Sequence, residues 1–441
     1  MAWDFGTDPD FQQKLDWMDD FVRQEVEPID LLFHGQPYAA FDPENLLASK
    51  IMAPLRESVK KQDLWACHLT PELGGKGWGQ VELALMNEIL GRSLFASRVF
   101  GCQAPDTGNA ELIAHFGTEE QKKKYLAPLL EGEIVSCFSM TEPQGGADPK
   151  VFTCRARREG DEYVIDGEKW FASNARFAEF LLVVVVTNPD VPIYQGASIL
   201  LVPKHTPGME IVRNVGTHGE AADAGAHAYI RFSGARVPLE NCIGDEGQGF
   251  VAAQTRLGGG RIHHAMRTMA SVRKAFDMLC ERALSRHTQG TALADKQMVQ
   301  EMIADSYIQM TQFRLHVLYA AWLIDKHQRY DREVRKEIAA VKVATATVLH
   351  DVVWRAIHLH GSLGVTDELP LAGMWSSVAV MATVDGPSEV HKLTVAKQVL
   401  RETEPAPGLF PSQHLPPRIA AAREKFARFI TAELEHHIAN S

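Results

Sequence analysis

Asp385 is the residue whose surroundings in this sequence best suit proton abstraction. It follows the largely apolar run VAVMATV and precedes Gly386. General-base catalysis uses a carboxylate in an apolar pocket, where burial raises its pKa toward the working pH. Asp before Gly is also a common turn, so the residue type alone leaves a structural role open. Glu389, four residues further along a predicted helix, is the competing carboxylate.

Other familiar catalytic patterns are missing from the sequence. The run GQGFVA at 247–252 matches G-x-G-x-x-A by its letters only, because no strand–turn–helix unit surrounds it. His263 and His264 are adjacent, and neither H-E-x-x-H nor paired C-x-x-C accompanies them. We therefore expect no metal site. A nucleophile elbow and a P-loop are also absent.

Three successive sequence patterns predict the secondary structure that must position these residues. Helical periodicity dominates to about residue 135, interrupted by the Gly-rich loop 69–79, and Thr118 with Gln121 has capping-box spacing. Short β-branched runs follow from 136 to about 240, among them FLLVVVV, which we expect to be a strand buried on both faces. Long helical blocks return near 250–287, 295–327 and 333–359.

The predicted fold class is therefore α+β, mostly α. We expect a helical domain at 1–135, a small β-domain at 136–245, a helical bundle at 246–402, and a Pro-rich linker with a last helix at 403–441. The three main parts each have enough chain for a core.

Composition narrows the function classes and the location. The 441 residues carry 45 Lys+Arg against 56 Asp+Glu, a formal net charge of -11, which argues against nucleic acid as a partner. No stretch of about 18 apolar residues predicts an integral membrane segment, and the acidic amino end does not look like a targeting peptide. Six singly spaced cysteines suit a reducing compartment, so we expect a cytoplasmic protein.

Eight ordered segments together carry a resemblance to a known family. They are LTPELGGKGWG, HFGTEEQKKKYLAPLLEGEI, SMTEP, DGEKWFASNA, VPLENCIGDEGQGF, SRHTQG, HLHGSLG and DGPSEVHKLTVAKQVL. In this order they resemble the flavin-dependent acyl-CoA dehydrogenase family over about 400 residues. The phrases GGGRIHHAMR and DGPSEVH are most similar to the branch of family members ten and eleven and their bacterial relatives.

The resemblance implies an N-terminal helical domain, a central β-domain and a C-terminal four-helix bundle, with FAD between the last two and across a subunit interface. It implies flavin contacts by Phe138, Met140, Thr141, Phe171 and Ser173, where Ser replaces the commoner Thr. Asp148 is a further contact, although Ala147 stands where the family usually has Ser.

Contacts to a neighbouring subunit's cofactor are also implied. The positions that match these parts of the family pattern are Arg286, Thr288, Gln289, His358, Gly361 and Ser362. Pro387 and Glu389 match cofactor-contact positions next to Asp385. An arginine suits a pyrophosphate because its planar fork binds two oxygens at once.

The implied reaction is α,β-dehydrogenation of an acyl-CoA thioester to a trans-2-enoyl-CoA in fatty-acid β-oxidation. Asp385 would remove the α-proton, and Arg261 and His264 would assist at the substrate. An electron-transfer flavoprotein would accept the electrons, and the enzyme would be a homodimer or homotetramer. Alternatives are phosphate elimination from a 4-phosphoacyl-CoA, a nitroalkane oxidase-like flavin oxidation, and a non-catalytic acyl-CoA-binding scaffold.

Overall fold

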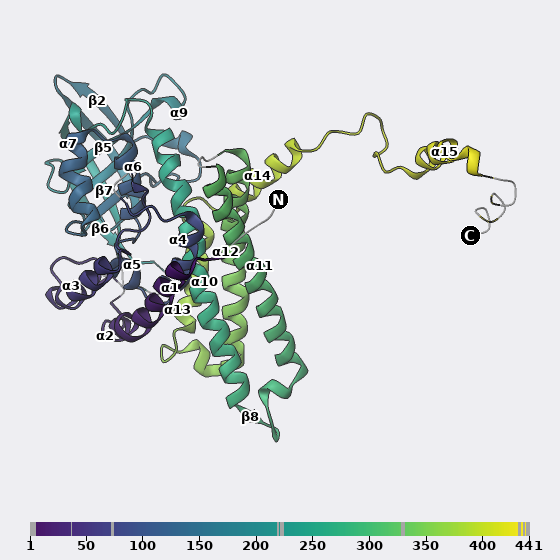
Figure 1. Ribbon diagram of the computed structural model, residues 1–441. Coiled ribbons are helices and arrows are strands. Elements are labelled where there is room, and N and C mark those ends of the chain that lie inside the picture. Colours follow the sequence, from purple (N-terminus) through teal and green to yellow (C-terminus); the bar gives the residue numbers. More distant parts are fainter. Residues whose placement is uncertain are drawn as a thin grey trace. The chain divides into compact units, whose positions relative to one another are not determined.

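Helices, a sheet and a second group of long helices follow one another along the chain (Figure 1). The computed structural model describes residues 6–36, 38–71, 75–217, 220, 225–327, 331–430, 434 and 437. It divides into two units, Met1–Val395 and Ala396–Ser441. Residues 72–74 of the predicted loop 69–79 lie outside the described part of the chain.

The first helical segment is built around local capping signals. Asp8 accepts a hydrogen bond from the Phe11 backbone N–H, and Pro9 begins the first helix, where its missing N–H has no cost. Thr118 and Gln121 form both halves of the predicted capping box, which confirms that prediction. The helices are α1 (Pro9–Phe21), α2 (Glu27–Leu32), α3 (Leu46–Lys61), α4 (Gln80–Leu90), α5 (Ala96–Val99), α6 (Asp106–Phe116), α7 (Glu119–Gln121) and α8 (Ala127–Leu130).

Seven strands form the sheet that follows. They are β1 (Ser136–Ser139), β2 (Arg155–Glu159), β3 (Glu162–Ser173), β4 (Phe180–Val186), β5 (Ala197–Pro203), β6 (Met209–Val215) and β7 (His227–Pro238). The short helix α9 (Ile193–Gly196) precedes β5. The strand order is β1-β4-β2-β3-β7-β6, β5 pairs with β4, and β1 also pairs with β3. The first six residues of β4 are buried, as the FLLVVVV pattern predicts.

Long helices follow the sheet, and the first four of them form the bundle. They are α10 (Gly249–Ser285), α11 (Gln297–His327), α12 (Arg332–His360), α13 (Leu371–Thr383) and α14 (Ser388–Arg401). The short strands β8 (His287–Thr288) and β9 (Thr291–Ala292) make the turn between α10 and α11, at the tip of both helices in Figure 1. Helices α10, α11, α12 and α13 pack against one another, and α10 also packs against α4 and α6.

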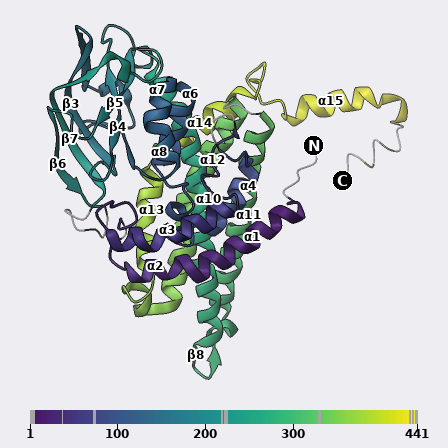
Figure 2. The ribbon, with the colours of Figure 1, turned by 60° about the vertical axis from the view of Figure 1, so that its left-hand side comes forward.

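One hydrophobic core joins the first helices to the bundle. Met18 of α1, Met86 of α4, Ile262 of α10 and Val317 of α11 are all buried in it. Figure 2 shows α1, α2 and α3 crossing the direction of the bundle helices. Other helices therefore cover α10 on several sides, so polar side chains on this helix can be buried. In the second unit, α15 (Leu415–Lys425) has no buried residue.

No helix within the described ranges has both the length and the apolar character needed to cross a bilayer.

Candidate active site

Asp385 stands between α13 and α14 in a conformation that few side chains adopt. Its φ is 55°, in the left-handed region that costs a non-glycine residue free energy. Its carbonyl oxygen accepts hydrogen bonds from Arg261 Nε at 2.9 Å and from His391 Nε2 at 3.2 Å. The side chain is only 13% exposed. Two hydrogen bonds therefore hold the backbone in a shape that points the carboxylate at α10.

Gly260 of α10 is where that carboxylate lies. A Cβ atom at this position would be 2.8 Å from Asp385 Oδ2, so the absence of a side chain makes the approach possible. His264, one turn later, places Nε2 3.6 Å from the same oxygen. Burial lowers the pKa of His264 to about 4, although the Asp385 charge acts in the opposite direction. A neutral imidazole therefore faces the carboxylate at neutral pH.

Two buried cations, Arg256 of α10 and Lys342 of α12, also feel the charge of Asp385. Arg256 is 8% exposed and Lys342 is fully buried. Burial lowers the pKa of Lys342 to about 8 and lowers that of Arg256, while Asp385 raises both. Lys342 Nζ donates a hydrogen bond to the Met381 carbonyl oxygen. The surroundings of Asp385 are therefore more cationic than an apolar pocket would be.

The sequence reasoning missed Arg256, Gly260 and Lys342, although each left a signal. Arg256, Gly260 and His264 are spaced by four residues, which places them on one face of a helix. Lys342 is a single charge in the otherwise apolar stretch AAVKVATATV, a pattern that indicates a buried, partnered lysine.

Arg256 links Asp385 to the sheet. Its Nε donates to Asn109 Oδ1 at 3.0 Å, and Asn109 Nδ2 donates to Ser136 Oγ at 2.8 Å. Its guanidinium carbon lies 4.0 Å from the centre of the Phe138 ring. Burial raises the pKa of Glu111 of α6 to about 7, although the charge of Arg256 acts in the opposite direction.

The sheet contributes an aromatic ring and a hydroxyl group to the candidate site. Phe138 of β1 is opposite Ser173 of β3. Ser173 Oγ lies 2.9 Å from Nδ1 of His227, whose pKa burial lowers. Phe171 has a φ of 52°, and its side chain remains 49% exposed. An exposed ring beside a fixed hydroxyl fits a flat heteroaromatic group with polar edges, as the flavin of FAD has.

The Met140–Thr141 segment is held from behind by the sheet. Lys169 Nζ donates to the Met140 carbonyl oxygen at 2.9 Å, and the Trp170 backbone N–H donates to the Thr141 carbonyl oxygen at 2.9 Å. Lys169 also forms a fully buried ion pair with Glu142, at 2.8 Å. These contacts fix the segment that the family pattern assigns to the flavin ring.

Three other predicted residues lie near these elements in different settings. Asp148 is exposed, and its carboxylate accepts a hydrogen bond from the Lys150 backbone N–H, where it caps a short 3-10 turn. Pro387 is partly buried directly after Gly386. Glu389 is exposed in the first turn of α14, a poorer position for a buried base than that of Asp385.

The remaining predicted cofactor residues lie far from Asp385 in the same chain. Arg286, Thr288 and Gln289 are exposed at the β8 turn, 25 residues beyond Arg261 along α10, or roughly 37 Å at the helical rise. The second set begins at His358, 16 residues beyond Lys342 along α12, or roughly 24 Å at the helical rise, and includes Gly361 and Ser362 in the turn after it. One chain therefore does not bring these two sets to Asp385.

Three family models together match most of the chain. They are the N-terminal, middle and C-terminal domains of acyl-CoA dehydrogenase, over residues 9–133, 137–234 and 247–400. The chain is 37% identical to acyl-CoA dehydrogenase family member 10 of Mus musculus over 406 residues, which are 90% of this chain and 37% of that protein. It is 38% identical to FadE2 of Mycobacterium tuberculosis, described as a probable acyl-CoA dehydrogenase, over 87% of this chain and 93% of that protein.

The chain thus spans about half or less of the vertebrate relatives it matches, but nearly all of FadE2. Among solved structures, a Mycobacterium abscessus protein described as an acyl-CoA dehydrogenase superposes with a TM-score of 0.82 at 34% identity, covering 90% of this chain and 99% of that one. A glutaryl-CoA dehydrogenase of Mycobacterium smegmatis, solved with FADH2, has a TM-score of 0.75 at 21% identity, covering 90% and 96%.

Proposed function

We propose that this chain, which belongs to the acyl-CoA dehydrogenase family, introduces the α,β double bond into an acyl-CoA thioester. The predicted family, fold class and dependence on FAD are confirmed at the level of the family. The observation that carries the proposed reaction is the partly buried Asp385 carboxylate, held against Gly260 by a strained and doubly hydrogen-bonded backbone.

In the proposed reaction, Asp385 accepts the α-proton of the thioester. FAD, when bound, supplies the acceptor for the hydride that leaves the β-carbon. Negative charge that develops on the thioester oxygen gains from nearby fixed positive charge and N–H donors, and Arg256 and His264 provide these. The neutral state of His264 leaves Asp385 free to take the proton, because no imidazolium competes to hold the carboxylate as an ion pair.

The flavin side is assigned to Phe138, Met140, Thr141, Phe171 and Ser173. Their support is the sheet register that places Phe138 opposite Ser173, together with the exposed Phe171 ring. We further propose that Arg286, Thr288, Gln289, His358, Gly361 and Ser362 serve the cofactor of another subunit, because a single chain holds them away from Asp385. The proposal includes a homodimer or homotetramer, an electron-transfer flavoprotein as acceptor, and a cytoplasmic location.

The test compares three variants of the FAD-loaded enzyme with a straight-chain acyl-CoA series and an electron-acceptor dye. Asp385→Asn should lower kcat at least 1000-fold, because it removes the base. Asp385→Glu should lower it less, since the carboxylate survives but is one methylene longer. Glu389→Gln should stay within a few-fold of the parent. Full activity in Asp385→Asn would show that another group is the base.

The cationic surroundings favour a second candidate reaction at the same site. A purely hydrocarbon acyl chain gains nothing from the charges of Arg256 and Lys342, whereas a phosphate on the chain would be attracted by both. The candidate is elimination from a 4-phosphoacyl-CoA, in which the carbon chain loses one proton and the phosphate, with no net electron transfer. Phosphate release from 4-phosphovaleryl-CoA without any acceptor supports this candidate. Strict acceptor dependence with simple acyl-CoAs counts against it, and no phosphate release from 4-phosphovaleryl-CoA excludes it.

A further inference from the structure

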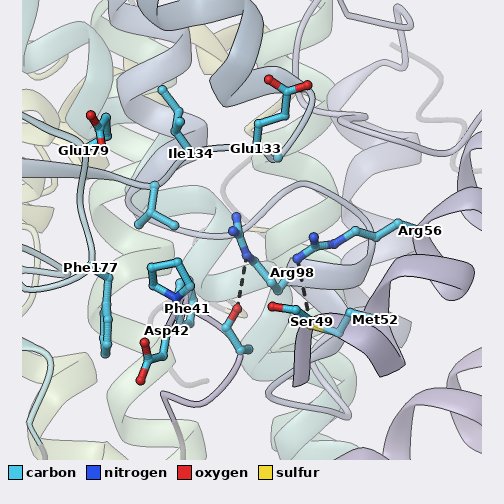
Figure 3. A pocket seen from close by; sticks show the side chains of 14 residues that line it. Phe41, Asp42, Ser49, Met52, Arg56, Arg98, Glu133, Ile134, Phe177 and Glu179 are labelled. Carbon is cyan, nitrogen blue, oxygen red and sulfur yellow. Dashed lines mark hydrogen bonds between the residues drawn. The ribbon is translucent and has the colours of Figure 1, made fainter. Parts of the chain in front are cut away.

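A cavity of about 360 Å³ lies away from Asp385, and none of the proposed catalytic or cofactor residues lines it (Figure 3). Its walls come from the segment 40–43, from α3, from Arg98 of α5, from the segment 132–135 that leads into β1, and from the turn before β4. The cavity therefore lies where the first helical segment meets the sheet.

Two arginines, Arg56 of α3 and Arg98 of α5, line the cavity and lie close together in Figure 3. Arg98 is only 7% exposed; its Nε donates to the Ala40 carbonyl oxygen at 3.3 Å, and its Nη1 lies 3.8 Å from Asp106 Oδ2. Arg56 is half-buried and contacts the Met52 sulfur at 3.9 Å. Its Nε is buried and has no hydrogen-bond partner.

Ion pairs neutralise the two guanidinium groups of the cavity poorly. Within the described ranges, the ion pairs leave Arg56 with no carboxylate, and Arg98 has one at the edge of ion-pair distance. Burial and the like charge of Arg98 lower the pKa of Arg56 to about 10. A guanidinium taken from water in this way is costly unless an anion joins it.

Three carboxylates, Asp42, Glu133 and Glu179, also belong to the lining, so the arginines are not its only charged groups. Glu133 and Glu179 are exposed, and in Figure 3 their carboxylates point away from the two guanidinium groups. Asp42 is partly buried and forms no ion pair with either arginine. In the part of the chain that the structure describes, none of the three acids forms an ion pair with Arg56 or Arg98.

Apolar side chains form the rest of the wall. Phe177 is 7% exposed and Met52 is 2% exposed, and Phe41 and Ile134 are partly buried beside them. A pocket with an apolar wall and a few convergent charged groups is the usual shape of a small-molecule site. We propose that this cavity binds a small organic oxyanion, its phosphate or carboxylate group between Arg56 and Arg98 and its apolar body against Phe41 and Phe177.

The experiment titrates the full FAD-loaded chain by calorimetry with phenyl phosphate, benzoate and inorganic phosphate. Phenyl phosphate and benzoate share a ring and differ in the oxyanion, whereas inorganic phosphate lacks the apolar body. We expect one site per chain for at least one of the two ring compounds, at least 10-fold tighter than for inorganic phosphate. The tighter of the two identifies the oxyanion.

Arg56→Gln should weaken that binding at least 10-fold and leave dehydrogenation of an acyl-CoA unchanged. Lys50→Gln is the matched control, because it removes one positive charge from an exposed position on the same helix outside the lining; its binding should equal that of the parent. Thermal unfolding of each variant checks the fold. The proposal is overturned if neither ring compound binds at 10 mM, or if the two variants bind equally well.

Discussion

Adding one methyl group at Gly260 tests whether the position of the Asp385 carboxylate sets the rate. The Cβ of Gly260→Ala would lie 2.8 Å from Asp385 Oδ2. Non-bonded contacts are favourable from about 3.5 Å, so the carboxylate must retreat by about 0.7 Å. Misplacement by about 1 Å costs on the order of 100-fold in rate, so we expect kcat to fall roughly 10- to 100-fold.

The same substitution should not destabilise the fold. Alanine is favoured over glycine inside a helix by up to about 1 kcal/mol, and the displaced atom is the end of a movable side chain. Activity and stability should therefore change in opposite directions, which separates this effect from unfolding. Gly373→Ala is the control, because it adds a methyl group to α13 where no atom lies within 4 Å.

The assay is the rate of dye reduction at saturating acyl-CoA, with circular dichroism to follow thermal unfolding. Gly373→Ala should keep the parent kcat. If Gly260→Ala also keeps it while remaining folded, then the carboxylate position does not limit the reaction, and the assignment of Asp385 as the base loses its geometric support.

Three further predictions concern buried charges. Lys169→Met leaves Glu142 buried and unpaired, so denaturant unfolding should show a loss of about 3–5 kcal/mol, largely recovered when Glu142→Leu is added; a loss under 1 kcal/mol would contradict this. Burial raises the pKa of Glu111 from 4.5 to about 7, so its contribution to stability is lost as pH rises through that range. The unfolding free energy of Glu111→Gln minus that of the parent should thus increase by about 3 kcal/mol from pH 4.5 to pH 8. It would not change with pH if the carboxyl group is solvated. Burial lowers the pKa of His264 from 6.5 to about 4, so as the pH falls this histidine is protonated in the unfolded chain before it is protonated in the folded one. Between pH 7 and pH 5 stability should fall by about 2 kcal/mol on its account, a fall that His264→Gln removes and the exposed-site control His205→Gln does not.

Local sequence signals predicted the elements well. The block expected near 250–287 is α10 at Gly249–Ser285, and the block expected near 295–327 is α11 at Gln297–His327. Periodicity, capping residues and β-branched runs act within a few residues of one another, so a single sequence carries them. The domain boundaries predicted from these sequence patterns stay predictions.

The surroundings of Asp385 could not be predicted in the same way. Gly260, Lys342 and His391 come from three helices, and only the folded bundle brings them to one carboxylate. Nothing in a glycine's sequence context says that a side chain from 125 residues later will occupy its missing Cβ. The expected apolar pocket was likewise a local inference from VAVMATV, and it did not include the cations that α10 and α12 contribute.

The irregular pairing of β3 with β7 limits which insertions and deletions the strand can accommodate. The pairing of β3 with β7 shifts register between Lys169 and Ala172, and Phe171, which lies within this shift, has a φ of 52°. Side chains of a strand alternate between its two faces, so loss or gain of one residue at this shift would exchange the buried Ala172 with the exposed Phe171. We therefore expect the strand to tolerate substitution far better than insertion or deletion at this point, and changes in length to be accepted more readily in the turns that join the strands.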